Sequence, residues 1–276
     1  MKKLVVKPIG GMCNRLYCLA SAVALAKLQN RELIVLWDLK WEFNARLGDI
    51  IVDKQYNIIY KDEYNFPRRH FDKLFVSFEK YKRNALLFTN ERMYAVSREI
   101  GTTNFQSFFG QFAESEIIYI ESCFNFIPNR NFKLTEIFQP TAEILGEMNG
   151  ELKKLGNNFI GMHIRRTEHQ YALDYSPDEV FINNLLTESK SDNVLLVTDD
   201  QKTEDKFVEQ FGSRLYIYSK DKRRDTLKSV KSAMVNIMLL SKSRIIYGSF
   251  NSTFSTFPAE YGETPIKILA TEQAHL

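Results

Sequence analysis

Residues 158 to 169 read Asn-Phe-Ile-Gly-Met-His-Ile-Arg-Arg-Thr-Glu-His. The first half is apolar enough to form a buried strand, and the second half carries two adjacent arginines between a histidine and a carboxylate. In an open parallel sheet, ligands bind just beyond the carboxyl ends of the strands, which is where Arg165 and Arg166 would then lie. A guanidinium group offers a phosphate or carboxylate two parallel charge-assisted hydrogen bonds. The stretch therefore indicates an anion site; the alternative is a pair of weak surface ion pairs.

The chain after residue 158 alternates between strand-like and helix-like segments. Strands are expected at 158–164, 193–197, 215–218, 244–247 and 266–269, and helices at 176–189, 202–211, 226–241 and 252–261. Ser176, Pro177 and Glu179 are expected to start the first helix as cap, first-turn proline and capping-box glutamate. Gly212 is expected to end the second helix. This regular alternation predicts an α/β domain with a parallel sheet.

Three loops are expected to converge at the carboxyl edge of that sheet. Residues 165–174 bring the two arginines, residues 198–201 bring Asp199 and Asp200, and residues 248–253 bring small polar side chains to a helix N-terminus. The polar side chains of the third loop are Ser249, Asn251, Ser252 and Thr253. Hydroxyls and free backbone N–H groups at a helix start bind phosphate, so we expect a nucleotide or a nucleotide sugar as ligand.

The first half opens with a strand, a loop, a helix and a strand, at residues 3–9, 10–15, 16–29 and 32–37. These lengths suit a right-handed βαβ crossover. The Gly10-Gly11 pair at the turn lets the backbone approach a ligand closely, or serves only as a tight turn. The loop has neither the spaced glycines of the dinucleotide fingerprint nor the lysine of a P-loop.

The middle of the chain is the hardest part to interpret. Residues 38–116 mix charge with aromatic residues, for example at 41, 64 and 66, and include a basic cluster at 68–70. We expect short helices, irregular loops and one or two strands there. A strand at 117–126 and a mostly helical stretch at 132–155, interrupted at Pro140, follow. We place a domain boundary so that residues 1–145 and 146–276 form two α/β domains.

Composition excludes several classes of protein. The chain has 276 residues, 44% of them hydrophobic, and a net charge of +3, which is too small to indicate nucleic-acid binding. Cys13, Cys18 and Cys123 form an odd set without metal-ligand spacing, which indicates reduced thiols. The N-terminal apolar run is broken by Lys7 and Pro8, and no window is long enough to span a membrane. We expect a cytoplasmic protein.

Four motifs together resemble the fucosyltransferase superfamily of α-1,6-fucosyltransferases, bacterial chitooligosaccharide fucosyltransferases and protein O-fucosyltransferases. They are Gly-Gly-Met-Cys-Asn-Arg-Leu at 10–16, His-Ile-Arg-Arg-Thr-Glu at 163–168, Val-Thr-Asp-Asp at 197–200 and Ser-Phe-Asn-Ser-Thr-Phe at 249–254. Their order and rough spacing hold over residues 1–37 and 157–262, whereas residues 38–130 show no match.

The resemblance implies a GT-B fold, in which two Rossmann-like domains face each other across a cleft. It implies GDP-fucose as the donor substrate, inversion at the anomeric carbon, and no metal or other cofactor. The C-terminal domain would bind the nucleotide sugar, and the N-terminal domain mainly the acceptor. Arg165 would contact the β-phosphate, and Ser252 and Thr253 the pyrophosphate. Asn14 would approach from the other domain, together with the rest of the glycine-rich loop: Gly11, Met12 and Cys13.

His163 and Asn236 would contact the nucleoside. His163 would lie near the base or ribose, and its alternative is a buried structural histidine. Asn236 stands sixteen residues before Ser252, where the resemblance leads us to expect an aspartate that reads guanine. The carbonyl of an asparagine offers a single acceptor atom beside an NH2 donor, so another base remains an alternative.

The catalytic base has three candidates after the arginines: Glu168, His169 and Asp174. Related α-1,6 enzymes place a glutamate at the position of Leu173 here, so the adjacent Asp174 is the first choice. An inverting transfer needs such a group to take the proton of the acceptor hydroxyl, or a substrate that manages without one. The alternative for Asp174 is a loop aspartate before the helix at 176–189.

We therefore expect an inverting, metal-independent transferase of fucose from GDP-fucose to a glycan acceptor, with a role in bacterial surface polysaccharide synthesis. One alternative is a glycosyltransferase that uses another nucleotide sugar, and another is a catalytically silent nucleotide- or glycan-binding protein. The basic residues at 220–224, with Lys228 and Lys231, form either a solvated face or a peripheral membrane contact near a lipid-linked acceptor.

Overall fold

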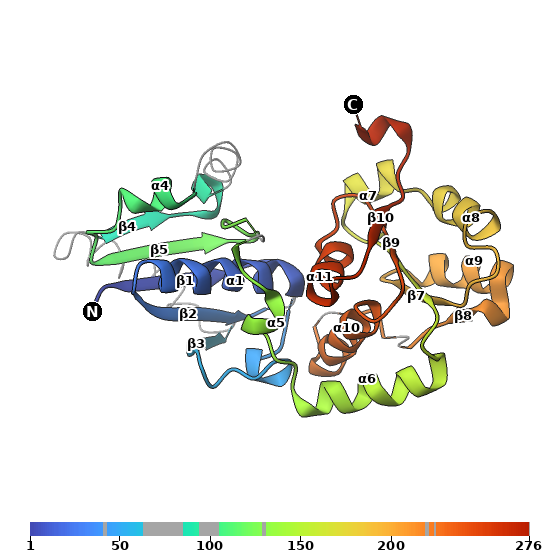
Figure 1. Ribbon diagram of the computed structural model, residues 1–276, viewed down its shortest axis with the longest axis horizontal. Coiled ribbons are helices and arrows are strands. Elements are labelled where there is room, and N and C mark those ends of the chain that lie inside the picture. Colours follow the sequence, from blue (N-terminus) through green and yellow to red (C-terminus); the bar gives the residue numbers. More distant parts are fainter. Residues whose placement is uncertain are drawn as a thin grey trace. The chain divides into compact units, whose positions relative to one another are not determined.

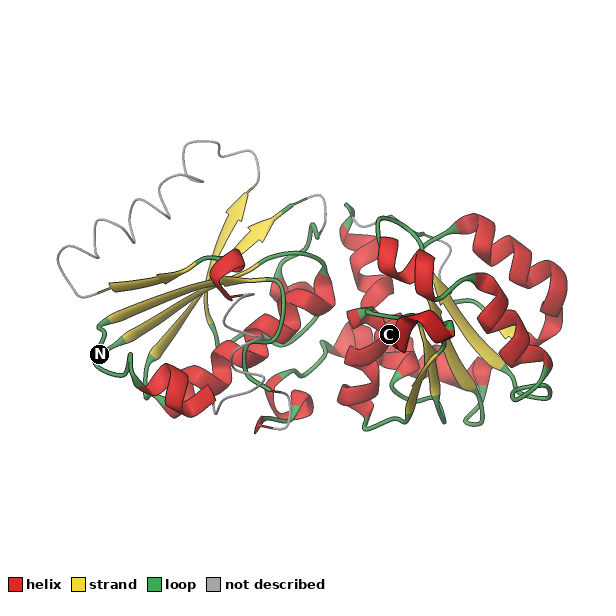
Figure 2. Ribbon diagram, turned by 90° about the horizontal axis from the view of Figure 1, so that it is seen from above, coloured by secondary structure: helices red, strands yellow, loops and turns green. Residues whose placement is uncertain are grey.

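The computed structural model describes residues 1–40, 43–62, 85–93, 105–128, 131–218, 221–223 and 225–275. The chain divides into two compact units, Met1–Gln139 and Pro140–Leu276 (Figure 1). Each unit contains a parallel five-stranded sheet with helices packed against it (Figure 2). The predicted fold class, two Rossmann-like α/β units with parallel sheets, is confirmed. The predicted basic cluster at 68–70 and the aromatic residues at 41, 64 and 66 lie outside the described residues.

The first unit has the strand order β3-β2-β1-β5-β4. Its strands are β1 (Lys3–Pro8), β2 (Glu32–Leu39), β3 (Asn57–Asp62), β4 (Ala85–Phe88) and β5 (Ile117–Ser122). Its helical segments are α1 (Met12–Leu28), η1 (Leu47–Asp49), α4 (Phe105–Gly110) and α5 (Leu134–Ile137). Helix α1 joins the neighbouring parallel strands β1 and β2, as the predicted crossover requires. The expected strand at 117–126 ends early, at Ser122.

A buried arginine holds the glycine-rich loop of the first unit. Arg15 is fully buried; its Nε donates to the Gly10 carbonyl at 2.8 Å and its Nη1 to the Asp38 carbonyl at 2.6 Å. The guanidinium lies 5.2 Å from the ring centroids of both Trp37 and Phe43. Gly10 has a φ of +81°, a backbone conformation that residues other than glycine rarely adopt. The loop before α1 is therefore fixed against the carboxyl end of β2.

The second unit has the strand order β10-β9-β6-β7-β8. Its strands are β6 (Ile160–Ile164), β7 (Val194–Thr198), β8 (Leu215–Tyr216), β9 (Ile246–Gly248) and β10 (Ile266–Ile268). Its helices are α6 (Ala142–Leu155), α7 (Gln170–Tyr175), α8 (Asp178–Leu186), α9 (Gln201–Phe211), α10 (Leu227–Leu240) and α11 (Thr253–Gly262), with short 3-10 turns η3 (Gly212–Arg214) and η4 (Glu272–His275). All five residues of the central strand β6 are buried, as its apolar sequence predicts.

Two glycines let helices approach this sheet closely. A Cβ placed on Gly161 would meet Leu240 Cδ2 of α10 at 2.7 Å, and a Cβ on Gly248 would meet the Cβ of Ser255 at 2.5 Å. Both distances are shorter than van der Waals contact. The Leu240 methyl group is the end of a flexible side chain, whereas the Cβ of Ser255 moves only with its helix, so a side chain at 248 would push α11 away from the sheet. Gly248 thus sets how near α11 lies to the end of β9.

The predicted capping box at the start of α8 is wrong. Helix α8 begins at Asp178 with Pro177 as its N-cap and without a side-chain cap. Ser176 is fully buried; its hydroxyl donates to the Leu269 carbonyl at 2.6 Å and accepts from the Phe250 N–H at 2.8 Å. Tertiary contacts therefore use the hydroxyl that the local pattern assigned to a helix cap. Gly212 does end α9, and Pro140 does separate α5 from α6, as predicted.

No helix within the described ranges is both long enough and apolar enough to cross a membrane.

Candidate functional site

Three loops of the second unit meet where its central strands end. Strand β6 lies between β7 and β9, with His163 level with Val197 on one side and Gly248 on the other. The parallel direction of all three strands puts the segments that follow them at the same edge. The predicted convergence of the loops after residues 164, 198 and 248 is confirmed.

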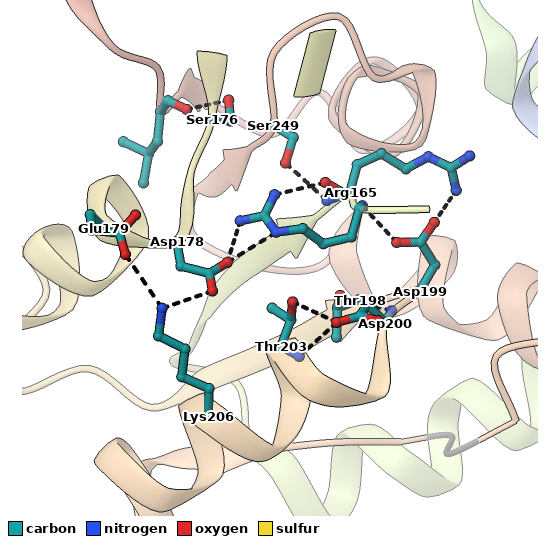
Figure 3. A network of polar contacts seen from close by, with 12 residues as sticks. Arg165, Ser176, Asp178, Glu179, Thr198, Asp199, Asp200, Thr203, Lys206 and Ser249 are labelled. Atoms are coloured by element: carbon teal, nitrogen blue, oxygen red, sulfur yellow. Dashed lines mark hydrogen bonds and ion pairs between the residues drawn. The ribbon is translucent and has the colours of Figure 1, made fainter. Parts of the chain in front are cut away.

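Asp199, at the end of β7, organises the arginine loop (Figure 3). Its Oδ1 accepts from the N–H groups of Arg166 at 2.8 Å and Thr167 at 3.4 Å. Its Oδ2 accepts from the Thr167 hydroxyl at 2.5 Å and from Nη1 of Arg165. Burial alone would raise the pKa of Asp199, but the Arg165 charge and these hydrogen bonds outweigh it and lower the pKa. The carboxylate is therefore ionised and holds both the main chain and the first guanidinium.

Arg165 is fixed at its backbone as well as its side chain. Its N–H donates to the Ser249 hydroxyl at 2.9 Å, and that hydroxyl donates to the His163 carbonyl at 3.3 Å. The Arg165 side chain retains 19% of its exposure, and Figure 3 shows its guanidinium beside Asp199. The loops after β7 and β9 thus both hold Arg165, a cation that reaches the surface, as an anion site requires.

The guanidinium of Arg166 forms its hydrogen bonds with groups of the protein. Its Nε and Nη2 donate to Asp178 Oδ1 at 3.0 and 2.5 Å, and its Nη1 donates to the Arg165 carbonyl at 2.8 Å. The guanidinium lies 5.8 Å from the Phe181 ring centroid, and the side chain is only 9% exposed. Lys206 donates to the other oxygen of Asp178 at 2.9 Å. Burial would raise the pKa of Asp178, but these two cations lower it. These contacts indicate that Arg166 fixes the conformation of the loop.

His163 is buried behind the arginines. The residue is 3% exposed, its Nδ1 lies 2.8 Å from the Ser255 hydroxyl, and its ring stacks on Phe254 with centroids 4.8 Å apart. Burial lowers the pKa of His163 to about 3, and the charges of Arg165 and Arg166 act in the same direction. The imidazole is therefore neutral at physiological pH.

The third loop carries its polar groups into the start of α11. Ser249 is fully buried and Ser252 is 6% exposed, whereas Asn251 is exposed with a φ of +52°. Ser252 is the N-cap of α11, and Thr253 is the first residue of the helix. The first N–H groups of this ten-residue helix belong to the same edge as Arg165.

Two of the predicted carboxylates have other neighbours. Asp200 caps α9 by accepting from the N–H of Thr203 at 2.8 Å and from its hydroxyl at 2.9 Å. Asp174 is exposed on α7, a helix not expected within this loop, and accepts from Gln170 Nε2 at 2.7 Å.

The two residues before α7 are the remaining candidates for the base. Glu168 is exposed and has a φ of +55°. His169 caps α7 with its Nδ1, which accepts from the Ala172 N–H at 3.1 Å. Burial lowers the pKa of His169, with a further contribution from Arg165.

The remaining predicted residues lie elsewhere. Asn236 is half-buried on α10. The other four belong to the first unit: Gly11 is the N-cap of α1, Met12 and Cys13 are buried, and Asn14 is half-buried.

The structure adds residues that the sequence pattern did not single out. Thr167 and Asp178 complete the hold on the arginine loop, Lys206 supports Asp178, and Ser255 and Phe254 enclose His163. Asp178 is an acidic residue in the first turn of a helix, where such residues are common. Its sequence position therefore gave no indication that it binds Arg166, twelve residues earlier.

The basic segment near 222 is paired locally. Lys222 donates to Glu204 at 2.6 Å and to the Thr198 carbonyl at 3.1 Å, Arg223 pairs with Asp221, and Lys231 pairs with Glu143. Positions 220 and 224 lie outside the described residues. In the same described part of the chain, no group of three or more His, Cys, Asp or Glu side chains is placed to hold a metal ion.

Comparisons with known proteins rest on structure alone. No protein-family model and no curated protein matches the sequence. The fold is similar to fucosyltransferase NodZ from Bradyrhizobium, with a TM-score of 0.64 and 17% identity over 95% of this chain and 92% of that one. It is also similar to a mutant of Arabidopsis thaliana FUT1 in complex with GDP (0.61; 13%; 96% and 69%) and to POFUT1 in complex with GDP-fucose (0.57; 10%; 97% and 98%). At these identities, the likeness establishes the fold.

Proposed function

We propose that this protein is an inverting glycosyltransferase that transfers fucose from GDP-fucose to a hydroxyl of a glycan acceptor and needs no metal. The observation that carries the proposal is Arg165, placed at the carboxyl end of β6 with its backbone held by Ser249 and its guanidinium by Asp199. The fold supports it, because NodZ and POFUT1 structures similar to this chain were determined with GDP-fucose.

The leaving group accounts for the need for an arginine. When the bond between the anomeric carbon and the β-phosphate oxygen breaks, negative charge develops on GDP. A preorganised cation lowers the energy of that charge most when no reorganisation is needed at the moment of reaction. We assign this role to Arg165. Ser252, Thr253 and the first N–H groups of α11 would bind the same pyrophosphate, with His163 and Ser249 beside them.

The acceptor hydroxyl attacks the anomeric carbon from the opposite face and must lose its proton. Asp174 is our first candidate for the base and Glu168 the second, since both are exposed on the segment that follows Arg165. We further propose that residues 146–276 bind the donor and residues 1–145 mainly the acceptor. The glycine-rich loop with Asn14 would contribute to the donor from the first unit.

A second candidate function differs from the first in the base of the nucleotide that the protein binds. Asn236 offers one carbonyl acceptor, whereas guanine presents two neighbouring donors that a carboxylate satisfies together. A glycosyltransferase specific for a different nucleotide sugar is therefore the alternative.

An anionic, lipid-linked acceptor would need cations other than Lys222, Arg223 and Lys231, which are paired within the protein.

Thermal-shift titration with GDP, UDP and dTDP separates these functions. We expect GDP to raise the melting temperature of the wild type and to have no effect on Arg165→Ala. Stabilisation by UDP but not by GDP would reject the fucosyl donor. Turnover of GDP-fucose, measured as GDP release with and without EDTA, distinguishes an enzyme from a silent binding protein and tests metal independence. NMR of the product anomeric proton tests inversion.

A further inference from the structure

The hydroxyl of Ser255 connects three segments of the site. It lies 2.8 Å from Nδ1 of His163 and accepts from the N–H of Ser249 at 3.2 Å. Ser255 is fully buried, because Gly248 leaves room for it against the end of β9. On the other side, the imidazole ring stacks on Phe254 at an interplanar angle of 25°. The ring of His163 is therefore fixed in both position and orientation.

The hydrogen bonds around Ser255 select one tautomer of the ring. The oxygen already accepts from Ser249, and its own proton meets an acceptor among the described residues only at Nδ1 of His163. If Nδ1 carried a proton, the buried hydroxyl would lose its acceptor, which is costly in a protein interior. Nδ1 is then the acceptor, and the single proton of the neutral ring belongs to Nε2.

The Nε2 atom is the open end of this arrangement. Within the described part of the chain, the polar contact of the ring is the one made by Nδ1. The charged and titratable groups that act on the ring are Arg165, Arg166, His169 and Asp199. Three of these are cationic or become so, which disfavours a second proton on His163. The site therefore contains an uncharged N–H donor near a guanidinium.

We propose that Ser255 is a positioning residue, which holds His163 in the Nε2-protonated tautomer so that this N–H donates to an oxygen of the bound nucleotide. The choice of ligand rests on the proposed function, but the tautomer does not. A neutral donor differs from a second cation in that it binds a phosphate or ribose oxygen without opposing Arg165. It also remains unchanged over the pH range in which a free histidine would titrate.

Nitrogen-15 NMR of the histidine rings tests the tautomer directly. The chain contains four histidines, so the spectrum of His163→Phe identifies the signals of His163 by their absence. We expect wild-type His163 to show a protonated Nε2 and an unprotonated Nδ1 from pH 5 to pH 8. We expect Ser255→Ala to show a mixture of tautomers. A protonated Nδ1 in the wild type, or an unchanged spectrum in Ser255→Ala, would overturn the proposal.

A double-mutant cycle tests whether Ser255 acts through the ring. We expect His163→Phe to weaken GDP binding about tenfold, as the loss of one hydrogen bond to a phosphate oxygen predicts. We expect Ser255→Ala to weaken binding by a smaller factor, because part of the ring keeps the binding tautomer, and to cause no further loss when it is added to His163→Phe. Ser243→Ala is the matched control, because it removes a buried hydroxyl that donates to backbone carbonyls before the start of β9. Additive losses would show that Ser255 has only a structural role.

The two readouts separate the possible failures. If wild-type protein has the expected tautomer but does not bind GDP, the proposed function is wrong and the role of Ser255 in the ring geometry stands. If GDP binds and the tautomer is the other one, the proposed function stands and this inference is wrong.

Discussion

Replacing Asp199 by asparagine tests the central interaction of the site. The amide keeps the shape of the carboxylate, and its oxygen can still accept from the N–H groups of Arg166 and Thr167. The other half of the side chain becomes an NH2 donor that faces two further donors, the Arg165 guanidinium and the Thr167 hydroxyl. The substitution therefore removes two charge-assisted hydrogen bonds and leaves a guanidinium without its carboxylate.

The expected loss of stability is about 2–4 kcal/mol. A hydrogen bond to a charged group contributes about 1.5–3 kcal/mol, and breaking a buried ion pair costs about 3–5 kcal/mol. The Arg165 and Asp199 side chains are 19% and 15% exposed, so solvent screens part of this energy. With a urea m-value of about 2 kcal/mol/M, the midpoint should fall by about 1–2 M.

Urea denaturation can assign this loss to the second unit. Both tryptophans, at 37 and 41, lie in the first unit, so their fluorescence follows Met1–Gln139, whereas far-UV circular dichroism follows both units. If the units unfold independently, only the dichroism transition should shift. Asp192→Asn is the control, because the Asp192–Arg244 pair is half-exposed and contributes at most about 1 kcal/mol.

The pH dependence follows from the lowered pKa of Asp199. The stabilising carboxylate is fully ionised above the ordinary aspartate pKa of about 3.9, and its contribution is lost as the pH falls through the lower folded-state pKa. The gap between wild type and Asp199→Asn should therefore be equal at pH 7 and pH 5. A gap no larger than that of Asp192→Asn, or one that closes by pH 5, would refute the reasoning.

Three further outcomes are expected. Arg165→Lys should bind GDP more weakly than wild type but more tightly than Arg165→Ala in calorimetry, since the charge remains and the two-pronged fork is lost. Lys222→Met should lower the free energy of unfolding by about 3–5 kcal/mol, because it leaves the 4% exposed Glu204 side chain without its cation. Gly146→Ala on α6, where a Cβ meets no atom within 4 Å, should raise the free energy of unfolding by about 0.5–1 kcal/mol. Gly262→Ala should lower it by about 1–3 kcal/mol, because the added Cβ would lie 2.2 Å from a backbone oxygen. Urea titration checks the last two, and equal effects of the two glycine substitutions would contradict the packing argument.

The alternation of strands and helices was enough to predict the second unit. Buried strands such as Ile160–Ile164 have near-continuous apolar sequences because helices cover both faces of a parallel sheet. Strand direction then placed the loops after β6, β7 and β9 at the same edge. That part of the site depended on periodicity alone, without knowledge of any individual contact.

The individual hydrogen bonds within the site could not be predicted in the same way. Asp199 meets residues 32 to 34 positions earlier, and Ser176 meets a carbonyl 93 positions later. A serine before a proline and two acids has the local pattern of a helix cap, and only the position of Leu269 in space reveals its other use. Helix α7 was also missed, since its six residues are too few to show a clear period.

The close approach of Gly248 to Ser255 has a consequence for the site. Because a Cβ at 248 would lie 2.5 Å from the Cβ of Ser255, a larger residue at 248 cannot be accommodated unless Ser255 moves. Ser255 in turn contacts the ring of His163, so the three positions are linked through direct contacts. A substitution at 248 is therefore expected to disturb the ring of His163, even though that glycine has no side chain that could contact a substrate.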